Sequence, residues 1–555
     1  MRKIIILLAL PFLFIPEISS GQKNKTVVDT NKTPFIWEGA NVYFLMTDRF
    51  NNGDRTNDIN FGRAKQAAKL RGFEGGDIKG ISQKIDEGYF DQLGINAIWL
   101  TPVVEQIHDG VDEGTGLTYG FHGYWTRDWT KLDPNYGTEQ DLADMVEKAH
   151  AHGIRIILDA VINHTGPVTA VDTVWPEDWV RTNPQCDYKT FGGTTLCTLV
   201  KNLPDVKTET SGEVKLPPFL VEKWKAEGRY EKEVKELDEF FKRTGYPRSP
   251  RYYIIKWLTD YITKFGIDGY RGDTVKHTGE DVWADFKTQC NYAFAQWKKK
   301  HPEKVLDNNG FYTIAEVYNY GISAGQIFDF GDKKVNYYEH GFNNMINFEF
   351  KWNAKESYES LFSMYSDRLN TQLEGYSVLN YMSSHDDGQP FDGKREKNFE
   401  TANKLLLSPG VAQIYYGDET ARSLVVEGAE GDATLRSFMN WDDLKNNANT
   451  KKVLAHWQKI GMFRKNHPSI GAGIHKEISS SPYVFSRGYS NGKYIDKVII
   501  GLDLPKGRKE LKVSSVFKEG SKLYDAYSGQ FSTVINGRAT IDSEFDIVLF
   551  EQIGK

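Results

Sequence analysis

Residues 266–277 read GIDGYRGDTVKH, a short apolar and aromatic segment that ends in charged residues. Side chains of a strand repeat with period two, so Arg271 and Asp273 share one face. In a parallel barrel the C-terminal ends of the strands open on the catalytic side, and the arginine would keep the aspartate ionised there. Asp273 is then a candidate nucleophile. A solvent-exposed Arg/Asp pair on an edge strand is the alternative that this stretch alone leaves open.

Strand-like segments recur eight times along the chain, at residues 42–46, 97–100, 154–161, 268–273, 312–317, 345–350, 376–382 and 411–415. Amphipathic stretches such as residues 139–152 and 251–265 lie between several of them. Alternation of strand and helix is typical of a parallel sheet. We therefore predict an α/β fold, with a (β/α)8 TIM barrel as the catalytic domain over residues 37–470.

Two regions depart from this alternation. Residues 165–250 are far longer than an ordinary loop between strand and helix, and they predict a small inserted domain after the third strand. The charged run 221–241 within them predicts a solvent-exposed helical face. Residues 471–555 alternate short strands with turn signals such as Asn491-Gly492, which predicts a C-terminal antiparallel β-sandwich.

The N-terminus has the pattern of an export signal. Arg2 and Lys3 precede an apolar run over residues 4–15, and small or polar residues follow at 19–21. The run is too short to span a bilayer, and no other segment approaches ~18 uninterrupted apolar residues. We expect a signal peptide at 1–21, a linker at 22–36, and a mature protein that is periplasmic or secreted, without stable membrane insertion.

The net charge of -6 is well mixed, which disfavours nucleic acid as a partner. Aromatic residues make up 13% of the chain, and flat rings that carry a polar tip suit sugar ligands. Large α/β domains are also rich in aromatic residues for packing alone, so this is a weak indication. For the oligomeric state a monomer is the working expectation.

Three cysteines are present. Cys186 and Cys197 flank a glycine-rich loop in a chain with an export signal, which predicts a disulfide between them. Cys290 lies in a helical pattern and is predicted to be a buried core thiol.

Polar groups stand at the ends of further predicted strands. The third strand ends in DAVINHT with Asn163 and His164, the fifth in TIAEVY with Glu316, and the seventh in SSHDD with His385 and Asp386. Each of these residues alone is explained as readily by a satisfied core histidine or a helix-capping aspartate. Together with the fourth strand, they place three carboxylates, two histidines and an arginine around one mouth.

Carboxylates that crowd into one pocket hold different protonation states, because like charges raise one another's pKa. Cleavage of a glycosidic bond uses this difference: a protonated carboxyl donates to the leaving oxygen while an ionised one attacks the anomeric carbon. Glu316 follows an apolar run and suits the acid. Asp273, paired with Arg271, suits the nucleophile.

The segments DAVINHT, GYRGDTVKH, AEVY and SSHDD, in this order, resemble the four signature regions of the α-amylase family of glycoside hydrolases. GINAIWLTP, FHGYW, LPDV and GVAQIYYGDE agree with the resemblance, which runs from Trp37 to the C-terminus. The subgroup that looks most similar is the periplasmic α-amylases of bacterial maltodextrin systems, through YGFHGYWTRDWTKLDPNYGT, LPDVKTET and VLAHWQKIGMFRKNHPSIGAG.

The resemblance implies a role for each of these residues. Asp273 would be the nucleophile, Glu316 the acid/base, and Asp386 the third carboxylate that binds the distorted sugar. Six further side chains would bind substrate: Tyr124, His164, Arg271, Lys276, His277 and His385. Tyr124 would stack beneath the sugar ring, with ordinary core packing as its alternative.

Calcium is the cofactor that the resemblance implies, at two sites with oxygen ligands. The first would join the barrel to the inserted domain through Asn163, Asp205 and the backbone carbonyl of His277. The second would lie in DRFNNGDRTND and EGGD, with the ligands Asn52, Asp54, Asn57, Asp58, Gly75 and Asp77. An Asx-rich turn without a metal is the alternative for the second site.

The sequence thus predicts an exported retaining enzyme that cleaves α-1,4-glucosidic bonds within starch and maltodextrins. An α-glucosidase, cyclomaltodextrinase or neopullulanase specificity is the alternative, because loops set bond preference. A non-catalytic glucan-binding protein is a third reading. Two departures from the family bear on specificity: Gly272, which we expect to loosen the strand end, and Asp387, a second acid after Asp386.

Overall fold

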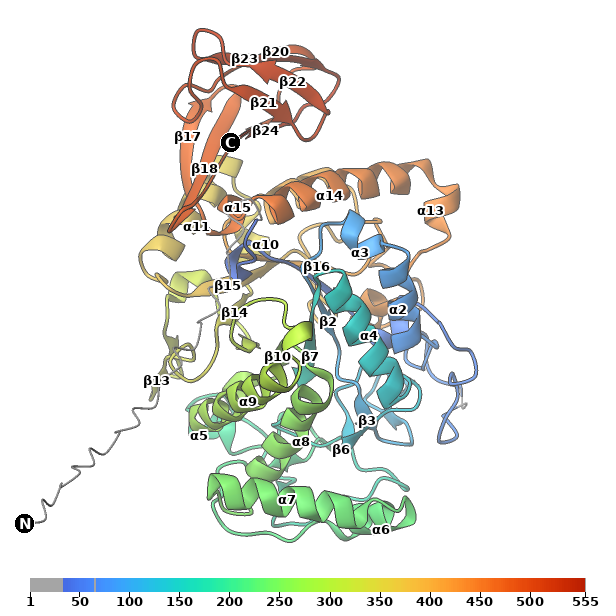
Figure 1. The fold of residues 1–555 in the computed structure, drawn as a ribbon. Helices are drawn as coiled ribbons and strands as arrows, with labels where there is room; N and C mark the ends of the chain where they lie inside the picture. Colours follow the sequence, from blue (N-terminus) through green and yellow to red (C-terminus); the bar gives the residue numbers. More distant parts are fainter. Residues whose placement is uncertain (1–32, 64–65, 555) are drawn as a thin grey trace, which may run out of the picture.

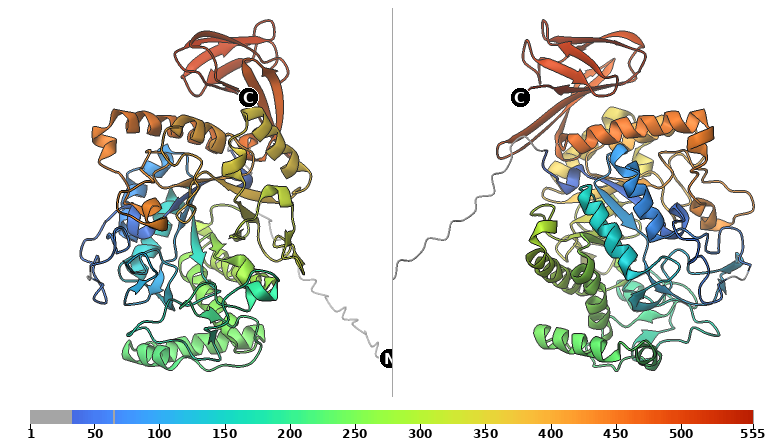
Figure 2. Two further views of the ribbon diagram at one scale, coloured as in Figure 1. Left: turned by 180° about the vertical axis from the view of Figure 1, so that it is seen from behind. Right: turned by 45° about the vertical axis from the view of Figure 1, so that its right-hand side comes forward.

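The computed structural model describes residues 33–63 and 66–554. The predicted signal peptide and most of the predicted linker lie outside these residues. None of the helices in the described part of the chain is long and apolar enough to cross a membrane. Figures 1 and 2 show the inserted domain at one end of the molecule, the barrel in the middle and the C-terminal sheets at the other end.

Eight parallel strands close into a barrel in the order β1-β16-β15-β14-β11-β10-β7-β2, which confirms the predicted (β/α)8 fold. Their buried, mostly apolar sequences are typical of parallel strands that are covered on both faces. The strands are β1 (Asn41–Leu45), β2 (Ala97–Leu100), β7 (Arg155–Ala160), β10 (Gly269–Gly272), β11 (Tyr312–Ala315), β14 (Asn344–Asn347), β15 (Ser377–Tyr381) and β16 (Val411–Tyr415).

Helices connect these strands around the outside of the barrel (Figure 1). The longer ones are α2 (Ile78–Asp86), α4 (Glu139–Ala151), α8 (Pro250–Phe265), α9 (Glu280–Lys300), α11 (Tyr358–Asn370), α12 (Asn398–Leu406) and α14 (Ala448–Asn466). Thr138 and Asp141 form a capping box that starts α4. Gly266, at a φ of 73°, ends α8 and turns the chain directly toward β10.

Gly272, at the end of β10, packs closely and does not loosen the strand. A Cβ atom there would lie 3.0 Å from the ring of Trp283 and 3.0 Å from Val275 Cγ2. The expected loosening was therefore wrong, because the adjacent helix α9 brings the Trp283 ring into the space that a side chain would need.

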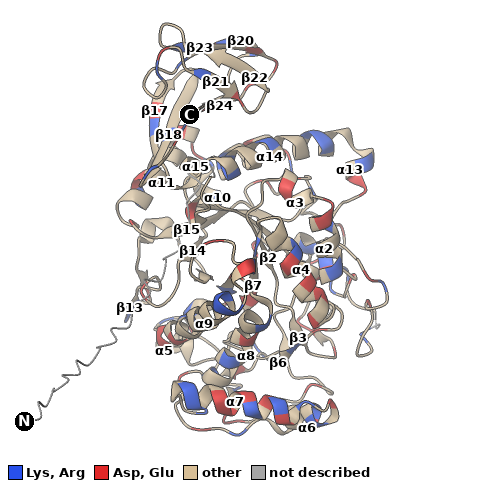
Figure 3. Ribbon diagram, in the orientation of Figure 1, with Lys and Arg blue, Asp and Glu red and all other residues tan. Residues whose placement is uncertain are grey.

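The inserted domain contains the strand pair β8 (Val180–Arg181) and β9 (Asp205–Val206), the short helix α5 (Gly192–Thr195), and α6 (Pro218–Ala226) and α7 (Tyr230–Thr244). Basic and acidic residues alternate along α7 (Figure 3). The run 221–241 is nevertheless not a purely solvated face, because it forms two amphipathic helices that bury Trp224, Leu237 and Phe240.

Both predictions about the cysteines are confirmed. Cys186 and Cys197 form a disulfide, with their Cα atoms 4.9 Å apart. Cys290 is a buried free thiol on α9.

The C-terminal region has the predicted β-sandwich. A six-stranded sheet runs β17-β18-β19-β24-β21-β22, and β20 pairs with β23 in a second sheet. Apolar side chains of both sheets, such as Ile499 and Ile541, share one core. The strands are β17 (Ile474–Ser480), β18 (Tyr483–Asn491), β19 (Tyr494–Leu502), β20 (Gly507–Lys512), β21 (Lys522–Asp525), β22 (Gln530–Thr533), β23 (Arg538–Ser543) and β24 (Val548–Gln552).

A buried histidine lies where α14 meets the C-terminal sheet. His467 Nδ1 is 2.9 Å from Asp496 Oδ1, and its Nε2 is 2.7 Å from Glu551 Oε2. Burial opposes a charge on this ring, but the hydrogen bonds to both carboxylates outweigh burial and raise its pKa to about 9. The residue is therefore an imidazolium at neutral pH and links the barrel to the sandwich.

Candidate active site

Arg271 is the centre of a buried charge cluster at the C-terminal end of the barrel. Its strand β10 pairs with β7 on one side and with β11 on the other. The Nη1 atom lies 2.8 Å from Asp159 Oδ1 and 2.7 Å from Asp273 Oδ1, and Nη2 lies 3.0 Å from Glu316 Oε2. One guanidinium thus contacts three carboxylates that belong to the ends of three adjacent strands.

Glu316 has the environment of a carboxylic acid that stays protonated. Burial raises its pKa to about 8, and the charges of Asp273 and Asp386 act in the same direction, against the lowering effect of Arg271. Its Oε2 atom also accepts a hydrogen bond from the backbone N–H of Thr274, 2.7 Å away. Glu316 therefore keeps a proton at neutral pH in a fixed position.

Asp273 is buried and oriented differently. Its Oδ1 faces Arg271, whereas its buried Oδ2 has no hydrogen-bond partner among the described residues. A carboxylate with one oxygen fixed and the other free of hydrogen bonds is suited to attack an electrophilic carbon.

Asp386 stands at the more open side of the same cluster, with 41% of its side chain exposed. Partial burial would raise its pKa, but His385, Arg271 and Arg436 outweigh burial and lower the pKa. Asp386 is therefore ionised. Its neighbour Asp387 forms an ion pair with Lys351, so its carboxylate is engaged there.

Two aromatic rings lie beside the carboxylates. The ring of Tyr124 stacks on that of His385 with centroids 5.3 Å apart, and its hydroxyl donates to Asp159 Oδ2 over 2.9 Å. His164 Nε2 lies 3.1 Å from the carbonyl oxygen of Tyr124. Burial lowers the pKa of His385 to about 4, so this ring is neutral and can share hydrogen bonds with hydroxyl groups.

Lys276 and His277 follow directly after the nucleophile candidate. Lys276 Nζ donates to the carbonyl oxygen of Tyr318 over 3.3 Å. His277 is buried, and its Nδ1 lies 3.1 Å from the carbonyl oxygen of Thr194, inside the disulfide loop of the inserted domain. Burial lowers the pKa of His277 to about 4.

The structure brings together more groups than the sequence motifs assign. Asp159 was assigned no role from the sequence. An acidic residue inside the apolar segment 154–161 could have indicated that this residue belongs to the site. The ring of Tyr318 is 53% exposed beside Lys276, and that of Tyr188 is 51% exposed beside His277. No sequence pattern links these two tyrosines, because they come from different segments.

Comparison with known proteins gives the same result as the geometry. The family model for "Alpha amylase, catalytic domain" matches residues 44–473. The chain belongs to the alpha-amylase family. It is 36% identical over 520 residues to a periplasmic alpha-amylase of Escherichia coli (strain K12), an alignment that covers 83% of this chain and 72% of that one.

Other members of the alpha-amylase family are more distant. A cyclomaltodextrin glucanotransferase of Bacillus sp. (strain 6.6.3) is 26% identical over 557 residues, covering 98% of this chain and 68% of that one. The crystal structure of an alpha-amylase from Geobacillus thermoleovorans, complexed with acarbose, superimposes with a TM-score of 0.65 at 21% identity, over 94% of this chain and all of that one. The structural likeness supports the shared fold.

Asn163, Asp205 and the carbonyl oxygen of His277 converge where the barrel of this alpha-amylase family chain meets its inserted domain. One end of the Asn163 amide lies 3.2 Å from Asp205 Oδ1 and 2.8 Å from the carbonyl oxygen of His277, and this end is either the nitrogen, which donates to both, or the oxygen. Oxygens this close repel one another unless the amide turns over to donate or a cation lies among them. The donor set contains oxygen alone, which fits a hard cation such as Ca²⁺.

The N-terminal loop is a second cluster of oxygen atoms. The Oδ1 atoms of Asn52 and Asn57 are buried and have no hydrogen-bond partner in the described chain. At Gly75 a Cβ atom would lie 2.5 Å from the Asn52 amide and 2.7 Å from Asp58 Oδ1, so glycine is required for this close approach. Unpartnered buried oxygens also fit a cation.

Two acids predicted for this cluster are engaged elsewhere. Asp54 binds Lys79 and Thr56 through its two oxygens. Asp77 caps α2 by accepting from the N–H of Gly80. Within the described residues, no group of three or more His, Cys, Asp or Glu side chains could hold a metal ion, so any bound cation would need amide and carbonyl oxygens in addition to a carboxylate.

Proposed function

We propose that the chain is a retaining α-1,4-glucan hydrolase in which Asp273 is the nucleophile and Glu316 the acid/base. The observation that carries this proposal is the single guanidinium of Arg271. Its Nη1 contacts Asp159 and Asp273, and its Nη2 contacts Glu316, whose pKa is raised to about 8. Double displacement at a sugar carbon needs two neighbouring carboxyl groups, one ionised to attack and one protonated to donate.

In the first step, Asp273 Oδ2 attacks the anomeric carbon and the bond from this carbon to the glycosidic oxygen breaks. Glu316 gives its proton to that oxygen, which leaves as the hydroxyl of the departing glucan. The sugar is then esterified to Asp273. Arg271 stabilises the carboxylate before the attack and faces the ester oxygen afterwards.

In the second step, the deprotonated Glu316 takes a proton from water as the water oxygen attacks the same carbon. The ester bond to Asp273 breaks, and the second inversion restores the original configuration. Asp386 is ionised and open to the cleft, and it would bind the sugar hydroxyls at the cleavage point. Tyr124 and His385 would form the ring-stacking and hydrogen-bonding wall of this subsite.

Starch and maltodextrins are the proposed substrates, with cleavage inside the chain. The choice of substrate follows the similarity to the periplasmic alpha-amylase. The similarity to cyclomaltodextrin glucanotransferases motivates an alternative activity, transglycosylation, in which a sugar hydroxyl replaces water as the acceptor. The relatives also support an exported, periplasmic protein. The catalytic unit would comprise residues 37–470, including the inserted domain.

Product analysis decides between these activities. Purified protein is incubated with amylose, maltoheptaose and pullulan, and products are separated by chromatography with a reducing-end assay. Mixed short maltodextrins from amylose support internal hydrolysis. Cyclic products would establish transfer, glucose alone would establish an α-glucosidase, and release of panose from pullulan would establish a neopullulanase. Binding without any new reducing ends would establish a non-catalytic protein.

Calcium is the cation that we propose for both oxygen clusters. At the first, Asn163, Asp205 and the carbonyl of His277 would hold the ion, which would fasten the inserted domain beside the catalytic mouth. At the second, Asn52, Asn57, Asp58 and the carbonyl of Gly75 would hold it. The ion supplies structural cross-linking there, and its ligands all suit Ca²⁺.

Thermal unfolding followed by circular dichroism tests the calcium proposal. A chelator should lower the melting temperature, and added Ca²⁺ should restore it. Asp205→Asn should reduce the calcium-dependent gain, whereas Asp238→Asn, on the exposed face of α7, should leave it unchanged. Equal melting temperatures of the wild type with and without chelator would contradict both sites.

A further inference from the structure

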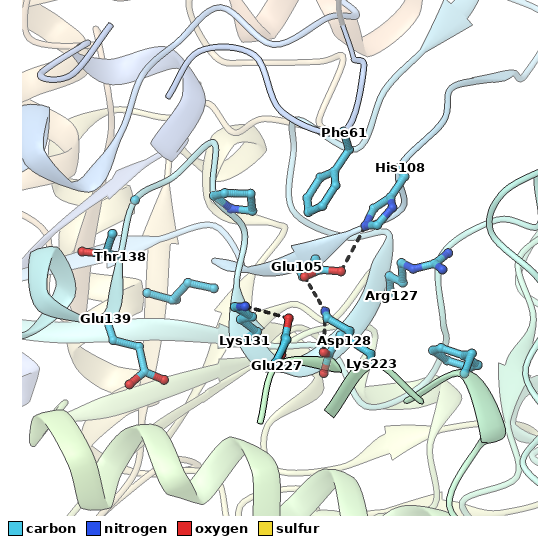
Figure 4. Close-up of a pocket in the computed structure, with 14 residues that line it drawn as sticks. Phe61, Glu105, His108, Arg127, Asp128, Lys131, Thr138, Glu139, Lys223 and Glu227 are labelled. Atoms are coloured by element: carbon cyan, nitrogen blue, oxygen red, sulfur yellow. Dashed lines mark hydrogen bonds and ion pairs between the residues drawn. The ribbon is translucent and has the colours of Figure 1, made fainter. Parts of the chain in front are cut away.

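A cavity of about 550 Å³ lies outside the carboxylate cluster. It is bounded by the hairpin of β3 (Val104–Gln106) and β6 (Thr126–Leu132), by α6, and by the loop that carries Phe61. Its volume falls within the range of ~300–1,000 Å³ that is typical of small-molecule sites. None of the residues that line it belongs to the site described above (Figure 4).

Aromatic and apolar groups form the walls of this cavity. The ring of Phe61 is stacked on that of His108, with centroids 3.7 Å apart and an interplanar angle of 8°. Phe61 is 44% exposed and has a φ of 53°, which is an uncommon conformation for a bulky residue. Phe219 and Lys223 of α6 lie one turn apart and both line the cavity. The loop thus holds Phe61 in a backbone conformation that phenylalanine rarely adopts, with its ring exposed at the rim of the cavity.

The charged groups of the cavity are paired, most of them with one another, while Arg127 pairs with Asp172 and Glu139 with Lys264 just outside it. Lys223 Nζ lies 2.5 Å from Glu105 Oε2 and 2.7 Å from Asp128 Oδ2. Lys131 pairs with Glu227 at 2.8 Å (Figure 4). Because each charge has an internal partner, the cavity offers no uncompensated charge to an ionic ligand. Lys131 and Glu227 keep 47% and 25% of their side chains exposed and can form hydrogen bonds to hydroxyls, whereas Glu105 and Asp128 are buried.

We propose that this cavity is an accessory binding site for α-glucan. Its ligand must be neutral, must have flat apolar faces for Phe61 and Phe219, and must carry hydroxyls for the paired charges; a glucosyl chain has all three properties. Strand β6 connects the cavity to the catalytic mouth, because Tyr124 precedes it by two residues and Asp128 lies within it. Four residues of chain span at most about 14 Å, which limits the distance between the backbones of Tyr124 and Asp128.

This placement gives the accessory site a purpose. A long glucan held in the cavity keeps other parts of the same polymer near the catalytic mouth, which raises their effective concentration there. A short oligosaccharide that fills the mouth alone gains nothing from the cavity. The inference rests on the proposed function for its choice of polymer, but binding can be measured without catalysis.

Binding is measured in the Glu316→Gln background, so that the polymer is not consumed. Migration in native gels that contain soluble starch gives a dissociation constant for this protein and for the same protein with Phe61→Ala. The matched control adds Phe531→Ala, which removes a 70% exposed phenylalanine from the C-terminal sandwich. Loss of the stacking face should weaken starch binding about fivefold or more, and the control should leave it unchanged.

A second measurement separates a binding role from a structural one. In the otherwise wild-type enzyme, Phe61→Ala should raise the KM for soluble starch at least as much as it weakens binding, with a much smaller effect on maltotriose hydrolysis. Phe219→Ala should give the same pattern from the opposite wall.

Equal starch affinity of the Phe61→Ala protein and its parent would overturn the inference. Equal losses of activity on starch and on maltotriose would also overturn it. A wild type that binds starch through Phe61 yet hydrolyses nothing would instead reject the proposed function and leave the accessory site standing.

Discussion

The catalytic mouth and the junction between barrel and sandwich both bury histidine among carboxylates, with opposite results. At the mouth, three carboxylates share the guanidinium of Arg271, and burial keeps His385 neutral with a pKa of about 4. At the junction, His467 lies between two carboxylates and has a pKa of about 9. Direct hydrogen bonds to two carboxylates give His467 its charge, whereas burial and the nearby cations Arg436 and Arg271 keep His385 neutral.

The largest effect on activity is expected from substitution of the two carboxyl groups proposed to act at the catalytic mouth. Asp273→Asn and Glu316→Gln should each lower kcat by about 10⁴-fold or more, because each removes a group that acts on the breaking bond in the proposed mechanism. The rate is measured as release of reducing ends from maltoheptaose. Asp238→Asn, on the exposed face of α7, serves as control. A Glu316→Gln enzyme with more than a tenth of wild-type kcat would refute the assigned role.

Removal of the shared cation tests the charge balance at the mouth directly. Arg271→Met leaves the buried Asp159 and Asp273 without their counter-charge, and such a loss in a buried site costs about 3–5 kcal/mol in the free energy of unfolding. Urea unfolding at pH 7 measures the loss. At pH 5 the loss should be smaller, since the carboxyls can take up protons.

The matched control for that experiment is Arg229→Met in the inserted domain. Its partner Asp128 keeps a second cation, Lys223, at 2.7 Å. The control should therefore lose much less stability than Arg271→Met. Equal losses of unfolding free energy in both variants would mean that Arg271 contributes no more to stability than a cation that shares its carboxylate with another.

The junction should show the reverse dependence on pH. Because the folded pKa of His467 is raised from 6.5 to about 9, its contribution is fully present below pH 6.5 and is lost as pH rises through 9. At pH 6, His467→Gln should lower the free energy of unfolding by roughly 2–3 kcal/mol. Above pH 9 the difference should vanish.

His475 provides a control at the same boundary. Burial lowers its pKa to about 3, so it is neutral at every pH of interest. His475→Gln should produce a stability difference that does not change between pH 6 and pH 9. A His467→Gln variant that shows the same flat profile would contradict the ion pair.

The smallest effect is expected in the pH profile of the intact enzyme. Glu316 must be protonated to act as the acid, so kcat/KM should fall about tenfold per pH unit above the pKa of about 8. Asp386→Asn removes one negative charge that raises this pKa, and the alkaline limb should move to lower pH. A wild-type limb below pH 6 would show that the environment of Glu316 does not raise its pKa.

Local sequence was sufficient to predict the barrel. The apolar segments around Ile98 and Ile157 have the composition of buried parallel strands, and the eight predicted strands match those observed to within three residues at each end. The motifs that follow the strands identified Arg271, Asp273 and Glu316, because barrel topology alone brings strand ends together. The disulfide followed from spacing and the export signal.

Contacts between distant segments could not be predicted. His467 follows the end of α14, whereas Asp496 and Glu551 lie in β19 and β24, and no periodicity relates them. The wall that Phe219 supplies to the cavity depends on how α6 docks against the hairpin. The run 221–241 was misjudged because its charges hide an apolar stripe, and this stripe becomes clear once Gly228 divides the run into two helices.

The closure of the barrel also orders events in time. β1 is hydrogen-bonded to β2 on one side and to β16 on the other, with Asn41 paired to Ala412. A nascent chain therefore cannot seal the ring until the ribosome has delivered residue 415, and until then both unfinished borders expose unsatisfied peptide groups. A complete carboxylate cluster therefore forms late in synthesis, after most of the chain has been made.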